Sequence, residues 1–171
     1  PTHYDWPTDT KGTVHLGKTL EAQDFVIEAP QGAARVNARV IGVVENQAPT
    51  RALEVDLPVR DGIVEGEGGT CQIALVERHR ATGDVVNGFV SGFGYNVPCA
   101  VASTVAHDSH HMIVVGTDRD CMALAANRLG EVGGGAIVIR GNEEIALVEL
   151  PVAGLMSDAP AVEVAAKAQD L

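Results

Sequence analysis

The feature that most limits how this chain can fold is a succession of apolar run, polar cap, amphipathic stretch and glycine stop in its second half. Residues 112–115 are continuously apolar, which suits a strand buried on both faces. Thr117, with Asp120 three positions later, predicts the start of a helix. The apolar residues that share one face of this helix are Met122, Ala125, Leu129 and Val132. Glycines 133–135 end it, and residues 136–139 predict a returning strand. Strand, helix and strand within about 30 residues predict a right-handed βαβ unit.

The rest of the chain shows more strand than helix. Further strands are expected at residues 36–41, 53–57, 63–64, 73–76 and 145–150. Turn residues at 46–49 predict a hairpin between the first two, and a second hairpin is expected around Gly141-Asn142. Ser157 or Asp158 would cap a final helix with Pro160 in its first turn. These patterns favour an α/β (α+β) fold, a mixed β-sheet domain with few helices and the βαβ unit near the C-terminal half.

The 171 residues are enough for one domain with its own core. Residues 1–20 carry prolines and a Thr/Asp-rich stretch ahead of any periodic pattern, and we interpret them as a linker from an upstream segment. Residues 21–171 are expected to form a single domain. Two small lobes near residues 21–85 and 86–171 are the alternative division.

The net charge of −11 limits the classes of partner. An acidic surface repels phosphate backbones, and no basic stripe with interleaved aromatic residues relieves that repulsion, so nucleic acid is not an expected partner. An uncharged free nucleobase is not excluded. The longest apolar stretch, residues 97–106, is far shorter than the roughly 20 residues that span a bilayer. With no basic-then-apolar leader, neither membrane anchoring nor secretion is expected.

Three widely spaced cysteines, Cys71, Cys99 and Cys121, form no CxxC pair. An odd number without such a pair indicates small buried thiols, and neither a disulfide framework nor a zinc ribbon. The expected location is therefore the reducing cytoplasm. Aromatic residues make up only 4% of the chain, so its core must be built from Val, Ala, Leu and Ile.

The densest group of chemically capable side chains is His107-Asp108-Ser109-His110-His111. It lies between two apolar runs, so a tight connection between buried strands would gather these side chains into a small volume. Imidazole and carboxylate groups move protons near neutral pH or bind transition metals. The residues alone leave a second interpretation open, a polar turn whose histidines satisfy backbone carbonyls. The HxxHH spacing is not a strong metal signature, and adjacent His110 and His111 would point to opposite faces of a strand.

Two other segments contain residues that can bind a ligand or approach a phosphate. Glu77-Arg78-His79-Arg80 follows a predicted strand. It is either a surface ion-pair patch or a group that turns Arg78 or His79 toward a ligand or a neighbouring domain. The glycine-rich stretch 88–94 is not followed by a helical pattern, so it does not indicate a phosphate-binding loop. Ser109 lacks the GxSxG elbow of a hydrolase nucleophile.

Several stretches, in order along the chain, resemble the C-terminal domain of adenine deaminases, bacterial and archaeal enzymes of the amidohydrolase superfamily. Two of them are Val76-Glu77-Arg78-His79-Arg80-Ala81-Thr82-Gly83 and Ala102-Ser103-Thr104-Val105-Ala106-His107-Asp108-Ser109-His110. The others are residues 39–41, 88–94, 113–116, 122–125, 127–129, 133–135 and 150–158. No single stretch is decisive, but their ordered succession over most of the chain is specific.

The resemblance implies hydrolytic deamination of adenine to hypoxanthine and ammonia. In that family a manganese or iron centre lies in a (β/α)₈ barrel, where the metal lowers the pKa of water so that hydroxide attacks the purine carbon bearing the amino group. The HxH pair and later ligands of that barrel have no counterpart here, and 171 residues are fewer than the roughly 200 that a barrel needs. We therefore expect a fragment that binds no metal, is inactive alone and works with its own N-terminal barrel domain in a homo-oligomer.

The resemblance also implies roles for individual residues. We expect His107, Asp108, Ser109 and His110 to form a loop that faces the barrel's active site and helps position substrate or water, with Asp108 orienting a neighbouring imidazole. Arg78, His79 and His111 are further candidates for substrate binding, and His111 stands where the family usually has Asn. Two alternatives are a structural module that covers the barrel or mediates oligomerisation, and an autonomous metal-binding module using His107, His110 and an acidic side chain.

Overall fold

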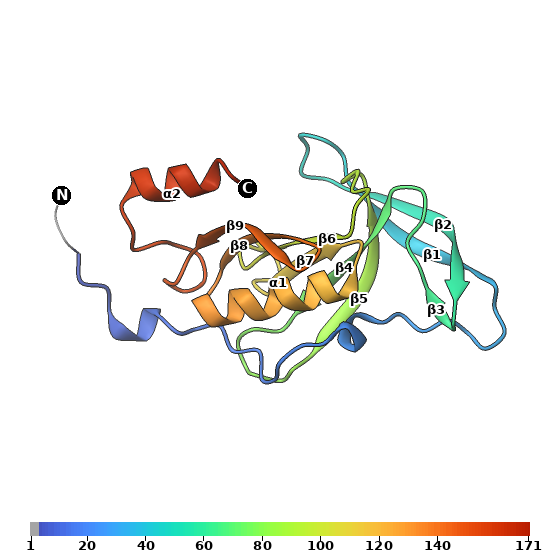
Figure 1. Cartoon of the computed structure of the whole chain (residues 1–171), viewed down its shortest axis with the longest axis horizontal. Helices are drawn as coiled ribbons and strands as arrows, with labels where there is room; N and C mark the ends of the chain where they lie inside the picture. Colours follow the sequence, from blue (N-terminus) through green and yellow to red (C-terminus); the bar gives the residue numbers. More distant parts are fainter. Residues whose placement is uncertain (1–3) are drawn as a thin grey trace.

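Nine strands form one mixed β-sheet in the computed structural model, which describes residues 4–171. Residues 1–3 of the predicted linker lie outside the described residues. The strands are β1 (Arg35–Gly42), β2 (Arg51–Arg60), β3 (Ile63–Val64), β4 (Thr70–Val76), β5 (Val85–Ser91), β6 (Cys99–Ser103), β7 (Met112–Gly116), β8 (Gly135–Arg140) and β9 (Glu143–Glu149). The sheet order is β3-β2-β1-β5-β4-β7-β6-β8-β9 (Figure 1). Neighbouring strands are antiparallel except for the parallel pair β1 and β5. The predicted mixed-sheet class and both predicted hairpins, β1–β2 and β8–β9, are confirmed.

Two α-helices accompany the sheet, α1 (Arg119–Val132) and α2 (Ala161–Ala168), with short 3₁₀ turns η1 (Thr8–Thr10) and η2 (Ala22–Phe25). Helix α1 connects β7 to β8. Both of these strands are antiparallel to β6, which lies between them, so they are parallel to each other. The predicted strand–helix–strand unit is therefore present in split form. Neither α-helix in the described part of the chain is long and apolar enough to cross a membrane.

Both predicted helix starts need correction. Helix α1 is capped by Asp118, whose side chain accepts a hydrogen bond from the backbone N of Cys121 at 2.9 Å. Thr117 is not the cap because its hydroxyl donates to the carbonyl of Val97 at 2.6 Å, which ties it to the sheet. Helix α2 begins after Pro160 without any side-chain cap, so Ser157 and Asp158 do not cap it. The predicted stop of α1 is confirmed, since Gly133 adopts a left-handed φ of 82°.

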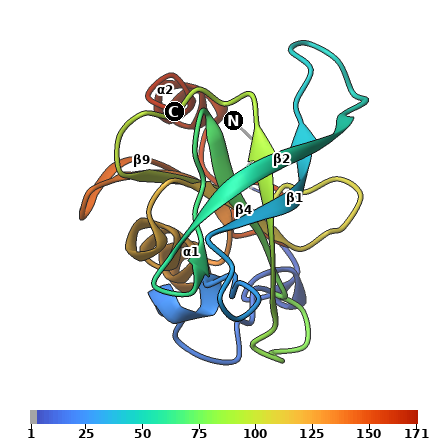
Figure 2. The same ribbon diagram turned by 90° about the vertical axis from the view of Figure 1, so that its right-hand side faces the viewer.

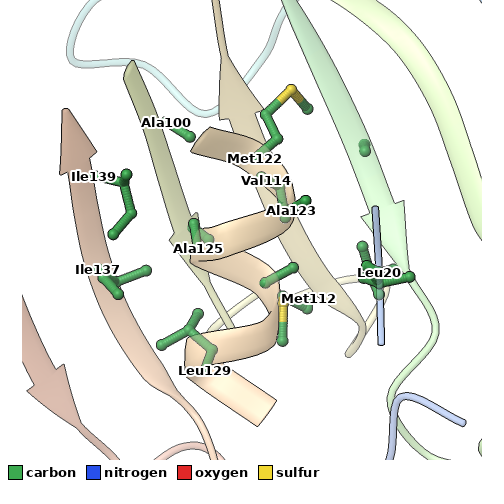
Figure 3. Packing of buried hydrophobic residues seen from close by; sticks show 14 of the residues in the cluster. Leu20, Ala100, Met112, Val114, Met122, Ala123, Ala125, Leu129, Ile137 and Ile139 are labelled. Atoms are coloured by element: carbon green, nitrogen blue, oxygen red, sulfur yellow. The ribbon is translucent and has the colours of Figure 1, made fainter. Parts of the chain in front are cut away.

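The main core lies between α1 and the strands β6, β7 and β8. Small residues on α1 allow the helix to approach the sheet closely, and larger side chains fill the spaces that remain. Figure 3 shows Met122, Ala125 and Leu129 of α1 packed toward the sheet. The strand residues of this core include Ala100, Met112, Val114, Ile137 and Ile139. Most of this core is the Val, Ala, Leu and Ile predicted from the scarcity of aromatic residues, and Phe25, Met112, Cys121 and Met122 are additional members.

The segment before β1 runs across α1 and adds to this core. Val14, Leu20 and Phe25 are buried. Asn127 of α1 holds the backbone of Leu20 on both sides, because its side-chain carbonyl accepts from the Leu20 N–H at 2.9 Å and its amide donates to the Leu20 carbonyl at 2.8 Å. The division of the chain at residue 20 stays a prediction.

The opposite side of the sheet is more open to solvent. Side chains alternate between the two faces of a strand, so neighbours of the core residues in sequence point away from α1. We define the open face as the exposed and half-buried aliphatic residues on β1, β4, β5 and β7 that point this way: Ile41, Ile73, Leu75, Val86 and Ile113. Figure 2 views these strands from the β1–β2 end of the molecule, with α1 to one side of β4.

Candidate functional site

The cluster of histidines occupies a turn between two buried, paired strands. Residues 104–111 connect β6 to β7, as the flanking apolar runs predict. The backbone N of His110 donates to the carbonyl of Ala106 at 2.8 Å, and the backbone N of His111 donates to Ser109 Oγ at 3.3 Å. His110 adopts a left-handed φ of 59°, a conformation that few non-glycine residues take. Ser109 therefore holds the turn together.

His107 and Asp108 project from this turn into solvent. Their side chains are fully exposed, at 100% and 104%, and His107 Nδ1 lies 3.3 Å from Asp108 Oδ1. The carboxylate is close enough to the imidazole to hydrogen-bond with it, and the orienting role that the resemblance implies for Asp108 stays a prediction. An exposed imidazole with a carboxylate beside it can accept, hold or donate a proton for a group brought to it from outside.

The register of the sheet brings a second segment against the turn. Val76, the last residue of β4, pairs with Met112, the first residue of β7, so the residues after β4 lie beside those before β7. Arg78 is only 2% exposed. Its Nε donates to the carbonyl of His110 at 3.0 Å and its Nη1 donates to the carbonyl of Ala153 at 3.3 Å. No carboxylate within residues 4–171 forms an ion pair with this guanidinium. Arg78 therefore joins the loop that contains His110 to the loop that contains Ala153.

His79 supports the same carbonyl from the other side. Its Nε2 lies 2.7 Å from the His110 carbonyl, and because a carbonyl can only accept, this nitrogen carries the proton. The rings of His79 and His111 lie 5.5 Å apart. His111 is half-buried, and its Nδ1 is buried without a hydrogen-bond partner among residues 4–171. The structure thus brings His79, Arg78, His110 and His111 together, while His107 and Asp108 stand apart from them.

Glu77 organises the turn that carries His79. Its carboxylate accepts from the backbone N–H groups of His79, Arg80 and Thr82 at 2.6 to 3.2 Å. Desolvation alone would raise the pKa of Glu77, but these three donors and the nearby charge of His111 together lower the pKa to about 2. Glu77 is therefore ionised at neutral pH and acts within the turn, not as a surface ion-pair partner.

Two residues that hold the loops around the turn, Thr104 and Ala153, were not predicted from the sequence. Thr104 is fully buried, its hydroxyl donates to the carbonyl of Gly154 at 2.6 Å, and the same oxygen accepts from the backbone N of Gly135 at 2.8 Å. Ala153 supplies the second carbonyl that Arg78 holds, in a left-handed conformation of φ 58°. The glycines at 134, 135 and 154 are the signal that could have indicated this close approach, but a glycine run beside a helix is read first as a helix stop.

A hollow lies where the histidine turn meets the open face. It has a volume of about 420 Å³, and its walls include Ile73, Leu75, Val86 and Ile113 with His107, Asp108 and Ser109 at its edge. The exposed side chains of His107 and Asp108 and the aliphatic residues of the open face therefore line the same hollow.

The described residues do not fit a metal centre. Among residues 4–171 no three His, Cys, Asp or Glu side chains are placed to hold one ion. His107 and His110 project from a turn without a third ligand converging on them. The geometry of residues 4–171 gives no support to the autonomous metal-binding alternative.

Comparison with known proteins confirms the resemblance to the C-terminal domain of adenine deaminases. The model of the adenine deaminase C-terminal domain matches residues 47–171. The adenine deaminase of Ruegeria sp. (strain TM1040) is 72% identical over 169 residues, which cover 99% of this chain and 28% of that protein. The adenine deaminase of Moorella thermoacetica is 46% identical over 164 residues, which cover 95% of this chain and 27% of that protein. The chain thus spans just over a quarter of the length of these curated relatives. It belongs to the adenine deaminase C-terminal domain family.

Proposed function

We propose that this chain is the C-terminal domain of a longer, cytoplasmic polypeptide that hydrolyses adenine to hypoxanthine and ammonia in purine salvage. The names of the similar proteins support this reaction, and the chain's 28% share of their length supports a second, larger part. That part would be an N-terminal barrel that binds manganese or iron, which supplies hydroxide for attack on the purine. The isolated chain would be inactive, and the whole protein would be a homo-oligomer.

The turn at residues 107–110 would face the active site of that larger part. The observation that carries this proposal is the contrast between the backbone and the side chains of the turn. The His110 carbonyl is held by Arg78 and His79, whereas the side chains of His107 and Asp108 contact solvent. A fixed backbone that presents an exposed imidazole and an exposed carboxylate suits the positioning of a substrate or water in a neighbouring site. Arg78 and His79 would then act as positioning residues and His111 would line the approach.

The second candidate is a structural module that covers the barrel or mediates oligomerisation without a part in the chemistry. The open face favours it, because exposed aliphatic residues on a central sheet are typical of an interface. The two candidates differ in what removal of an imidazole does to turnover.

The test uses His107→Ala and His110→Gly in the longer polypeptide, with His15→Ala as a matched control at another exposed histidine. Glycine is chosen at residue 110 because it accepts the left-handed backbone. The proposal expects kcat of the His107 variant to fall at least about tenfold with unchanged Tm and oligomer mass, since a positioned proton-transfer group contributes about a hundredfold or more. Weakened assembly with normal turnover per assembled site would favour the structural module instead.

A further inference from the structure

The open face exposes apolar side chains at positions where a sheet is normally covered. Val86 on β5 is 68% exposed and Ile41 on β1 is 43% exposed, although each of these strands has a neighbouring strand on both sides. The other face of β4, β5 and β7 is buried beneath the N-terminal segment and α1. Domains with a central sheet place a layer on each face that carries apolar residues, because exposed apolar area costs free energy in water.

The open face also has a hollow with room for a side chain. Gly88 lies on β5 between Val86 and Val90, and a Cβ built there would meet only Ile73 Cγ2, at 3.7 Å, an ordinary contact distance. The absence of a side chain at this position leaves the hollow open between neighbouring aliphatic walls. An apolar side chain from another segment could enter it.

We propose that the open face is the docking surface for the part of the longer polypeptide that lies outside this chain, and that an apolar side chain of that part fills the hollow at Gly88. The identity of the occupant rests on the proposed function. Most of the length of the relatives lies outside this chain, so a body large enough to cover the face is expected. The turn of His107 and Asp108 forms the edge of the same surface, so docking here would bring both side chains to that body.

A second copy of the chain fits this surface less well. Each copy has a net charge of −11, so two copies placed face to face would repel one another. Docking of the missing part also explains why the exposed polar groups and the exposed aliphatic residues share one surface.

The test is thiol labelling of Val86→Cys in the 171-residue chain and in the longer polypeptide. Val162→Cys is the matched control, because Val162 is 76% exposed on α2. The native cysteines are 1 to 7% exposed, so their background labelling is slow. We expect the thiol introduced at residue 86 to react at least about tenfold more slowly in the longer polypeptide than in the chain alone, since a covered thiol reacts only when the interface opens. The ratio of the labelling rates of Val162→Cys in the two proteins corrects for any difference in reactivity that does not depend on the open face.

Three results would overturn the proposal. Equal labelling at residue 86 in both proteins would show that the face stays open. Labelling of the chain alone that slows as its concentration rises would make the occupant a second copy. Labelling of the chain alone that slows when adenine is added would show that the occupant of the open face is a small molecule. The protection at residue 86 is measured without turnover, so a longer polypeptide that shows it but does not hydrolyse adenine would refute only the proposed function.

Discussion

At the scale of single residues, the turn depends on a buried cation that has no anionic partner among residues 4–171. Arg78 has two carbonyl partners, in loops that are distant in sequence, and is almost completely shielded from water. Burial lowers the pKa of its guanidinium, yet an arginine stays charged in a protein. A buried charge is retained only where hydrogen bonds compensate for the lost water, so the two carbonyls and the arginine stabilise one another.

Arg78→Met should therefore destabilise the chain. The apolar replacement leaves the carbonyl of Ala153 without the guanidinium donor and leaves the carbonyl of His110 with His79 as its remaining side-chain donor, which should lower the free energy of unfolding by about 2–4 kcal/mol. Arg80→Met, at an exposed arginine two positions away, should change it by no more than about 0.5 kcal/mol. Urea unfolding of the three proteins checks this, and equal midpoints for all three would show that Arg78 does not hold the loops.

Glu77 should make stability depend on pH in the acid range. Its pKa is about 2 in the folded chain, below the ordinary value of 4.5 for a glutamate, so the folded state favours the carboxylate. Its stabilisation is complete above about pH 4.5 and is lost as the pH falls toward 2. The difference in unfolding free energy between the wild type and Glu77→Gln should be largest at neutral pH and shrink across this window.

Denaturant unfolding at several pH values measures the effect of Glu77→Gln. Glu45→Gln, on the exposed turn between β1 and β2, is the control and should show only a small difference at every pH. A Glu77→Gln difference that is constant from pH 7 to about pH 2 would mean that the backbone donors do not depend on the charge of this carboxylate.

At the scale of elements, α1 organises both the sheet and the segment before β1. Its inner face packs on β6, β7 and β8, and Asn127 binds the backbone of Leu20. An amide side chain that satisfies both groups of one residue replaces a strand partner for an otherwise irregular segment. This contact explains how residues without periodic apolar patterning keep a fixed path over the helix.

Asn127→Ala should loosen that segment selectively. Loss of both hydrogen bonds should cost about 1–3 kcal/mol and should speed amide exchange in residues 14–25, while amides of the central strands remain protected. Arg128→Ala, which removes ion pairs to Glu131 and Glu144 at the surface, is the neighbouring control and should have a small effect. Unchanged exchange in residues 14–25 of the Asn127 variant would contradict the clamp.

The helices, strands and hairpins can be predicted from local sequence patterns, but the pairing of strands that are distant in sequence cannot. Helix α1, its glycine stop and the two hairpins were predictable because apolar periodicity and turn residues are encoded within short windows. The first residue of α1 was misplaced because the hydroxyl of Thr117 is bound by Val97, far away in sequence. The parallel pairing of β1 with β5 and the insertion of β6 between β7 and β8 depend on contacts that no short window contains.

The same limit explains how much of the site could be predicted. The turn at residues 107–111 was found because five chemically capable residues are adjacent in sequence. Its contact with Arg78 and His79 follows from the pairing of β4 with β7, which no short stretch of the sequence indicates. Thr104 and Ala153 escaped for the same reason, because their partners lie in distant loops.

At the scale of the whole molecule, the two faces of the sheet differ, because one face is covered by α1 and the other is open to solvent. The core beneath α1 is closed, whereas the open face combines exposed aliphatic residues, a hollow and the exposed side chains of His107 and Asp108. This asymmetry is what a domain shows when it completes its surface against a neighbour. It agrees with a chain that makes up 28% of the length of its relatives.

The most direct test compares the ammonia released from adenine by two purified proteins, the 171-residue chain alone and the longer polypeptide. We propose that the chain supplies a supporting turn and a docking surface, and that the reacting centre lies in the part outside it. We therefore expect enzymatic release by the longer polypeptide and only background release by the chain, with or without added manganese or iron. Release of ammonia at an enzymatic rate by the chain alone would contradict this proposal.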